Sequence, residues 1–133
     1  MTKRIINSPK LARSYWPASA HTTRAGDFIF VTGQVANQPG SDPRDRKETE
    51  LGTLEAQTIR VMENVKTILE EAGTSLENVV KRNVYLTHQG DFQPVYSILE
   101  RYFTSPVAST GVITGLVPAS ARVEVDVIAY IPR

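Results

Sequence analysis

Hydrophobic and polar residues alternate strictly near the end of the chain. Over residues 121–131, small and β-branched residues take every odd position, whereas Arg122, Glu124 and Asp126 take even ones. Period-two alternation dominated by β-branched residues is typical of a strand with one buried face. The sequence therefore predicts a strand here, with an acidic pair in the middle of its less buried face.

A second apolar run, residues 109–116, comes just before this strand. The segment between the two runs, residues 117–120, contains Pro118, which lacks the N–H that a strand ladder requires. Two strand-like runs separated by a short turn-forming segment are typical of a hairpin. We therefore expect the two runs to pair with each other.

Three further strands are predicted upstream. Residues 2–6 fit a short edge strand, and residues 79–87 alternate again. Residues 28–35 follow a turn signal at residues 25–27 and are largely apolar at both odd and even positions. We therefore expect a central strand that is covered on both faces. Gly33 inside that strand predicts a bulge or a close approach of another group to the backbone.

A helix is predicted over residues 53–72, where apolar residues recur at three- and four-residue spacing. Thr53 suits the N-cap, Glu55 suits the first turn, and Gly73 suits the position that follows the last turn. This segment carries the clearest helical pattern of the chain.

A second helix is predicted over residues 92–103. Asp91 is expected to cap it, and Pro94 lies in the first turn, where a missing N–H costs little. Phe92 begins the apolar stripe of this helix, so we expect its side chain to face the core.

The predicted order of elements is ββαβαββ. This order favours an α+β sandwich in which both helices cover one face of a mixed sheet. The other face would carry Arg122, Glu124 and Asp126 beside apolar residues of the strand at residues 28–35. Because such a surface is too apolar for water and too charged for a monomer core, we expect another subunit to cover it.

The chain has 133 residues, no cysteine and a formal net charge of +1. This length is expected to form a single domain over residues 1–133. The lack of cysteine excludes disulfides and thiolate chemistry, and the nearly neutral charge argues against nucleic acid or a membrane as a partner. No segment has the apolar length of a signal-peptide core or a membrane span, so we expect a cytoplasmic protein. His21 and His88 lack partners at ligand spacing, so no metal site is expected.

Four stretches of the sequence resemble one known family. They are RAGDFIFVTGQV, ILEEAG, ENVVKRNVYLTHQGDFQPVYSILERYF and VEVDVIAYIP. Together they resemble the Rid family of YjgF-like reactive intermediate deaminases. The resemblance implies a chorismate-mutase-like α+β fold, and a homotrimer with a central barrel and small-molecule clefts between subunits. It also implies hydrolysis of enamines and imines to ketoacids and ammonia without a cofactor.

The resemblance implies roles for particular residues. Glu124 stands at the place of the glutamate that holds the attacking water, and Gly33 matches a glycine whose backbone contacts the ligand. The family's carboxylate-binding arginine has no counterpart here. Counting back from Glu124 puts Ser109 at its position, and aligning on Pro106 puts Ala108 there.

Other pocket positions also differ from the family. Gly111 falls where many members have a cysteine, Ala18 or Ser19 replaces a tyrosine, and Tyr96 replaces an asparagine. Because the charge-assisted hydrogen bonds of the arginine are lost, we expect a substrate range shifted away from simple 2-imino acids. Two arrangements remain open: the backbone amides of Thr110 and Gly111 can cradle an oxygen or a smaller anion, or an aromatic pocket can accept a bulkier ligand.

The aromatic pocket would draw on residues 14–23, an irregular connector that contains Tyr15, Trp16 and His21, and on Tyr96 from the second helix. The simpler interpretation of this connector is that its aromatic side chains are anchors in the core or at an interface. The candidate catalytic residue is Glu124. The candidate substrate-binding residues are Gly33, Ser109, Thr110, Gly111, Tyr96, Ser19 and Trp16.

Three functions are compatible with these residues. The first is an enamine or imine hydrolase in which Glu124 positions water. The second is a non-catalytic trimer that binds a small metabolite or a protein partner in the cleft. The third, RNA cleavage, is disfavoured because no basic stripe with interleaved aromatic residues is present.

The carboxylates of Glu124 and Asp126 also have a purely structural interpretation. Glu124 is alternatively a partner of Arg122 in an interface ion pair. Asp126 is interpreted as structural, and repulsion between the two neighbouring carboxylates is expected either to raise one pKa or to recruit Arg122.

Overall fold

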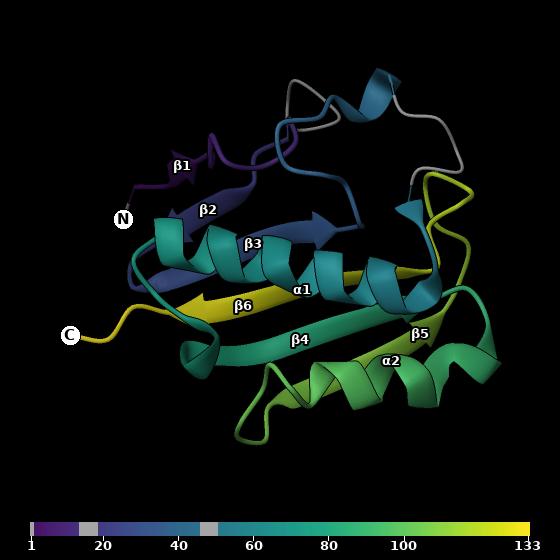
Figure 1. Ribbon diagram of the computed structural model, residues 1–133. Helices are drawn as coiled ribbons and strands as arrows, with labels where there is room; N and C mark the ends of the chain where they lie inside the picture. The colour runs from purple at the N-terminus through teal and green to yellow at the C-terminus, as the bar shows by residue number, and fades with distance from the viewer. Residues whose placement is uncertain (1, 14–18, 46–50) are drawn as a thin grey trace.

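The computed structural model describes residues 2–13, 19–45 and 51–133. Within these residues, six strands form one sheet and two α-helices lie against it (Figure 1). The strands and helices, in chain order, are β1 (Arg4–Ile6), β2 (Thr22–Ala25), β3 (Phe28–Gln34), α1 (Leu54–Glu71), β4 (Val79–Leu86), α2 (Phe92–Leu99), β5 (Ala108–Ile113) and β6 (Val123–Tyr130). Short 3-10 turns are formed by Pro43–Asp45, Leu76–Asn78 and Gln89–Asp91.

The sheet is mixed, with the strand order β1-β2-β3-β6-β4-β5. Strands β4 and β5 are parallel, and the other neighbouring pairs are antiparallel. The predicted hairpin between the last two strands is therefore wrong, because β6 lies between β3 and β4 while β5 pairs only with β4. Helix α2 carries the chain back along the sheet, so the strand that follows it runs parallel to the strand before it.

The positions of β5 and β6 in the sheet follow from their burial. The odd residues of β6 from Val123 to Ala129 are all buried, because α1 packs on their face and β3 and β4 flank the strand. Every residue of β5 is exposed in the single chain, as suits a strand at the edge. The last strand thus takes a central place although the chain reaches it after the edge strand has formed.

The start of the chain contains one strand more than predicted. The edge strand β1 is confirmed, but β2 lies partly within the connector that was expected to be irregular. It forms a hairpin with β3, with Ala25 opposite Phe28, across a turn in which Gly26 has φ of 59°. The turn at residues 25–27 is confirmed. The strand before it, with the sequence TTRA, lacks the apolar run that predicts a strand.

Both helices cover the same face of the sheet, as predicted (Figure 1). The boundaries of α1 also agree with the prediction. The Thr53 side chain accepts a hydrogen bond from the backbone N–H of Ala56 at 3.1 Å. Gly73 has φ of 89°, a left-handed conformation that glycine adopts at little cost.

Helix α2 differs from its prediction in three ways. It ends at Leu99 rather than near residue 103. Asp91 occupies the N-cap position, but its side chain makes no capping hydrogen bond and instead binds Arg122. Phe92 is 51 % exposed, so the expectation that it faces the core is wrong. Its ring stacks on Tyr96 instead, with centroids 4.3 Å apart.

The helix-free face of the sheet has the mixed character that the sequence predicts. Glu124 and Asp126 are half-buried there, and Tyr130 is exposed. Phe28 and Phe30 of β3 are 49 % and 42 % exposed, so within one chain this strand is covered on one face only. In the described part of the chain, no helix combines the length and apolar character needed to cross a bilayer.

Candidate active site

Glu124 lies on β6, on the helix-free face, beside an irregularity in β3. The register between β3 and β6 shifts between Val31 and Gln34, which brackets Gly33. A Cβ atom on Gly33 would lie 3.0 Å from both Cδ and Oε2 of Glu124. The predicted bulge and the predicted close approach therefore occur together, and the missing side chain of Gly33 leaves room for the carboxylate.

Glu124 and Gly33 line a cavity of about 420 Å³. Ser19 lines it too, so three of the predicted site residues meet here. Among the described lining residues, Glu124 is the acidic side chain and Arg13 the permanently cationic one. The remaining walls come from Ala12, His21, Thr32, Gln34, Val35, Asn37, Pro43, Asn64, Val117 and Pro118.

The carboxylate of Glu124 is free of ionic partners within the described residues. Burial raises its pKa above the ordinary 4.5, and the nearby charge of Asp126 raises it further. Arg122, the alternative ion-pair partner, instead donates two hydrogen bonds to Asp91, at 2.8 and 3.2 Å. A partly desolvated carboxylate with a raised pKa is suited to accept and return a proton.

The side chain of Asp126 is fully engaged within the sheet. Its Oδ1 accepts a hydrogen bond from Asn83 at 2.8 Å, and its Oδ2 accepts one from the Tyr85 hydroxyl at 2.9 Å. The hydrogen bond to Asp126 raises the pKa of Tyr85. Burial is the larger cause of the raised pKa of Glu124, and repulsion by Asp126 adds to it. Arg122 is not recruited, because it binds Asp91.

The other predicted binding residues lie on the opposite side of β4. Ser109, Thr110 and Gly111 belong to β5, which is separated from β6 by two strand spacings, roughly 10 Å. A Cβ atom on Gly111 would lie 3.0 Å from the hydroxyl of Tyr96, so these two residues are close neighbours. One chain therefore forms two separate groups, one around Glu124 and one around Tyr96. Trp16, like Tyr15 and Ala18, lies outside the described residues.

The hydroxyls of β5 are bound by basic residues of β4. Ser109 Oγ accepts a hydrogen bond from Arg82 Nε at 2.9 Å. Thr110 Oγ1 accepts one from Lys81 Nζ at 2.6 Å. Both hydroxyls therefore already have a partner before any ligand is considered.

His21 lines the cavity, but both of its ring nitrogens are used. Nδ1 accepts a hydrogen bond from the backbone N–H of Ser8 at 2.9 Å, and Nε2 lies 2.8 Å from the carbonyl oxygen of Ala12. This arrangement requires the proton on Nε2 and fixes the N-terminal segment against the cavity. Among the described residues, no group of three or more histidine, aspartate or glutamate side chains is placed to hold a metal ion.

Asn64 is a cavity residue that the sequence analysis did not identify. It is 2 % exposed, and its amide donates a hydrogen bond to the carbonyl oxygen of Asn37 at 2.9 Å. Its Oδ1 is buried without a hydrogen-bond partner in the described part of the chain. The available signal was an amide inside the apolar stripe of α1, where a buried polar group needs a partner.

Comparison with known proteins gives a family match over nearly the whole chain. The family model described as Endoribonuclease L-PSP matches residues 6–131. A RutC family protein of Pyrococcus abyssi is 37 % identical over 131 residues, which cover 98 % of this chain and 98 % of that protein.

Solved structures agree with this match. RidA from an Antarctic Psychrobacter is 30 % identical, with a TM-score of 0.81, and the match covers 96 % of this chain and 99 % of that one. Yeast Mmf1 is 25 % identical, with a TM-score of 0.83 over 98 % of this chain and 100 % of that one. The chain therefore belongs to the Rid family of YjgF-like proteins, which the L-PSP endoribonuclease model describes.

Proposed function

We propose that this protein is a cofactor-independent hydrolase of the C=N bonds of imines, and of enamines after their conversion to imines. The observation that carries the proposal is the carboxylate of Glu124. It is half-buried beside Gly33 in a cavity of about 420 Å³, and it has no ion-pair partner among the described residues. A carboxylate placed in this way can hold a water molecule against a small ligand.

The reaction requires only water and a group that transfers protons. Water adds to the imine carbon, Glu124 takes a proton from that water, and the imine nitrogen receives a proton. The resulting carbinolamine then loses ammonia and leaves a carbonyl group, so one imine and one water give one carbonyl compound and one ammonia. The raised pKa of Glu124 brings its proton affinity closer to that of the groups it serves.

The substrate is proposed to differ from a simple 2-imino acid. Position 109 carries serine rather than a cation, and a hydrogen bond to a charged group contributes about 1.5 to 3 kcal/mol. Arg13 provides a weak replacement in the Glu124 cavity, because its side chain is 71 % exposed and its Nη1 lies 3.5 Å from Asp42. Neutral or larger imines therefore fit the cavity better than small anionic ones.

The complete site is proposed to form between subunits of a homotrimer. The helix-free face exposes Phe28, Phe30 and Tyr130, and β5 is exposed along its whole length. Covering these surfaces with a second copy would remove apolar area from water. It would also allow the Glu124 group of one subunit to meet the Tyr96 group of its neighbour, which one chain keeps apart.

The hydrolase proposal is tested with imines that an amino acid oxidase generates in solution. Ketoacid and ammonia release are followed with small, aromatic and neutral imines. The wild-type protein is expected to accelerate release, and Glu124→Gln is expected to lose about a hundredfold or more of that acceleration. Glu70→Gln, an exposed change on α1, is the matched control and is expected to keep full activity.

The same assay separates catalysis from binding alone. A protein that only binds such ligands would show a ligand-dependent rise in melting temperature without any product. No acceleration by the wild-type protein with any imine class, or full activity in Glu124→Gln, would contradict the hydrolase proposal.

A further inference from the structure

One side of the Glu124 cavity is formed by residues 7–13, which we call the N-terminal wall. Ala12 and Arg13 of this wall line the cavity directly. Ser8 and Ala12 are only 5 % and 7 % exposed, so the wall packs against the rest of the protein. None of its residues belongs to a helix or a strand, so no regular hydrogen-bond ladder holds it in place.

His21 binds the N-terminal wall at three points. Its backbone N–H donates a hydrogen bond to Asn7 Oδ1 at 2.9 Å. Its ring accepts one from the backbone N–H of Ser8 at 2.9 Å and donates one to the carbonyl oxygen of Ala12 at 2.8 Å. The carbonyl oxygen of His21 in turn accepts a hydrogen bond from the backbone N–H of Thr32 in β3. One buried residue therefore joins both ends of the wall to the sheet.

The other polar contacts of the N-terminal wall lie nearer the surface. The backbone N–H of Arg13 donates to the carbonyl oxygen of Ser41 at 3.1 Å, and Arg13 Nη1 lies 3.5 Å from Asp42. The side chains of Arg13 and Lys10 are both 71 % exposed, and ion pairs of exposed side chains contribute little. The ring of His21 therefore makes the buried hydrogen bonds that fix the wall.

We propose that His21 is a positioning residue, which holds the N-terminal wall against the Glu124 cavity and so limits the size of the ligand that enters. This inference rests on the proposed function only in taking that cavity as the ligand site. A fixed wall around about 420 Å³ contacts small ligands closely and excludes bulky ones. A wall that can move outward would admit bulkier ligands and lose contacts with small ones.

The test uses unreactive amides, so that binding is measured without turnover. Benzamide is the smaller ligand and 2-naphthamide the bulkier one, and both are neutral and planar. Calorimetry and the melting temperature of the full-length protein give the ratio of their dissociation constants. His21→Leu removes both ring hydrogen bonds. It is expected to shift this ratio by about fivefold or more toward the bulkier amide, as the loss of one hydrogen bond shifts an equilibrium.

Two variants control for other effects of the substitution. The amide of His21→Gln offers one acceptor and one donor, as the imidazole does, and is expected to keep the wild-type ratio within about twofold. His88→Leu is the matched control, because the side chain of His88 is 70 % exposed and does not line the cavity. If His21→Leu does not fold, Asn7→Ala takes its place. It removes the acceptor of the His21 backbone N–H and is expected to shift the ratio in the same direction.

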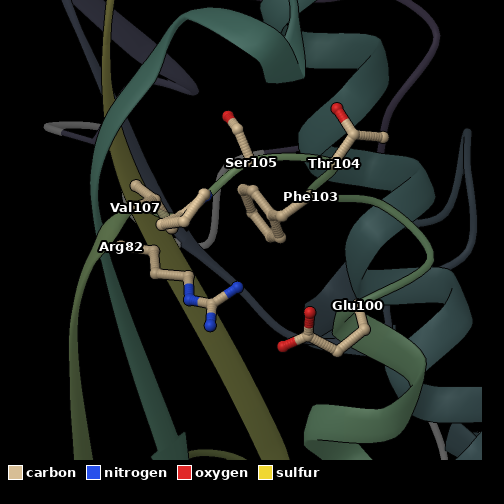
Figure 2. Close-up of a pocket in the computed structure, with 7 residues that line it drawn as sticks. Arg82, Glu100, Phe103, Thr104, Ser105 and Val107 are labelled. Carbon is tan, nitrogen blue, oxygen red and sulfur yellow. The ribbon is translucent and has the colours of Figure 1, made fainter.

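A second cavity distinguishes binding behind the wall from binding elsewhere on the protein. Figure 2 shows this cavity around Arg82, Glu100 and Phe103. Its described lining residues include none of the N-terminal wall and none of the Glu124 cavity. Amides bound there would keep the same ratio in His21→Leu.

Four results would overturn the inference. They are an absence of amide binding by the wild-type protein, an unchanged ratio in His21→Leu or in the variant that replaces it, an equal shift in His21→Gln, and an equal shift in His88→Leu. The outcome is distinguishable from that of the hydrolysis assay. A shifted ratio in a protein that hydrolyses no imine would contradict the proposed function alone, whereas hydrolysis with an unchanged ratio would contradict the role of His21 alone.

Discussion

The carboxylate of Glu124 occupies space that a side chain at position 33 would need. The nearest atoms to a Cβ there would be Cδ and Oε2 of Glu124, both at 3.0 Å. Gly33 has no positive φ, so an alanine would not strain the backbone. The close contact would instead displace the flexible end of the glutamate. The lack of a side chain at Gly33 therefore mainly determines the position of the Glu124 carboxylate. It contributes little to the stability of the strand.

Gly33→Ala is expected to lower imine hydrolysis at least tenfold while it changes stability by less than about 1 kcal/mol, because a flexible side-chain end can move at low cost. The measurements are kcat/KM and the melting temperature of the purified variant. Gly90→Ala is the matched control, since nothing lies within 4 Å of a Cβ at that position. Equal activity of the two variants would contradict a role of Gly33 in placing the catalytic carboxylate.

At the level of single residues, the sequence was informative where a residue was unusual for its element. A glycine inside an apolar strand predicted the close approach at Gly33, and a carboxylate in an alternating strand predicted the position of Glu124 on the helix-free face. Asp91 was misjudged because an acidic residue before a helix is usually a cap. Its partner, Arg122, is distant in the sequence, and no local pattern indicates that pair.

At the level of elements, the Asp91–Arg122 pair connects the start of β6 to the start of α2. Asp91 is 7 % exposed, and the guanidinium of Arg122 donates to both of its carboxylate oxygens. The pair therefore fixes the final strand against the helix layer after the chain has passed through β5.

Arg122→Gln is expected to lower the free energy of unfolding by about 1 to 3 kcal/mol, because it leaves a buried carboxylate without its partner. The measurement is equilibrium unfolding in urea. Lys10→Gln is the control, since the Lys10–Glu71 pair is exposed and such pairs contribute little. If both variants unfold at the same urea concentration as the wild type, the pair is not a structural link.

The success of sequence-based prediction also differs between elements. Helix α1 and the faces of β6 have strong periodicity, and both were predicted correctly. The predicted pairing of β5 with β6 is wrong. Nearness in the sequence favours a hairpin, but the crossover through α2 places β5 parallel to β4, and β6 lies between β3 and β4. Residues that the sequence predicted as one site, such as Glu124 and Gly111, thus lie on two sides of β4.

At the level of the whole molecule, the helix-free face leads to a prediction about assembly. Phe28 and Phe30 are exposed on it, next to the hydrogen-bonded cluster of Asp126, Asn83 and Tyr85. A face with exposed aromatic rings around a satisfied polar centre is suited to pack against further copies of the chain. The helix layer, by contrast, presents charged residues to solvent.

Phe30→Glu is therefore expected to dissociate the proposed trimer, because it would place a charge in the buried interface. Sedimentation velocity at low protein concentration measures the change. Lys66→Glu, on the exposed side of α1, is expected to leave the sedimentation coefficient unchanged. A wild-type protein that sediments as a monomer would contradict the proposed assembly and the shared site.

The central claim is that Glu124 acts as a carboxylate that takes a proton from water, and the pH dependence of imine hydrolysis tests it most directly. The group must be ionised to accept that proton, so the acceleration over the uncatalysed rate should rise with pH. Because burial raises the pKa of Glu124, the midpoint is expected above the ordinary value of 4.5. Glu124→Gln should give a low acceleration that does not vary over this range. An unchanged profile in Glu124→Gln would contradict the account.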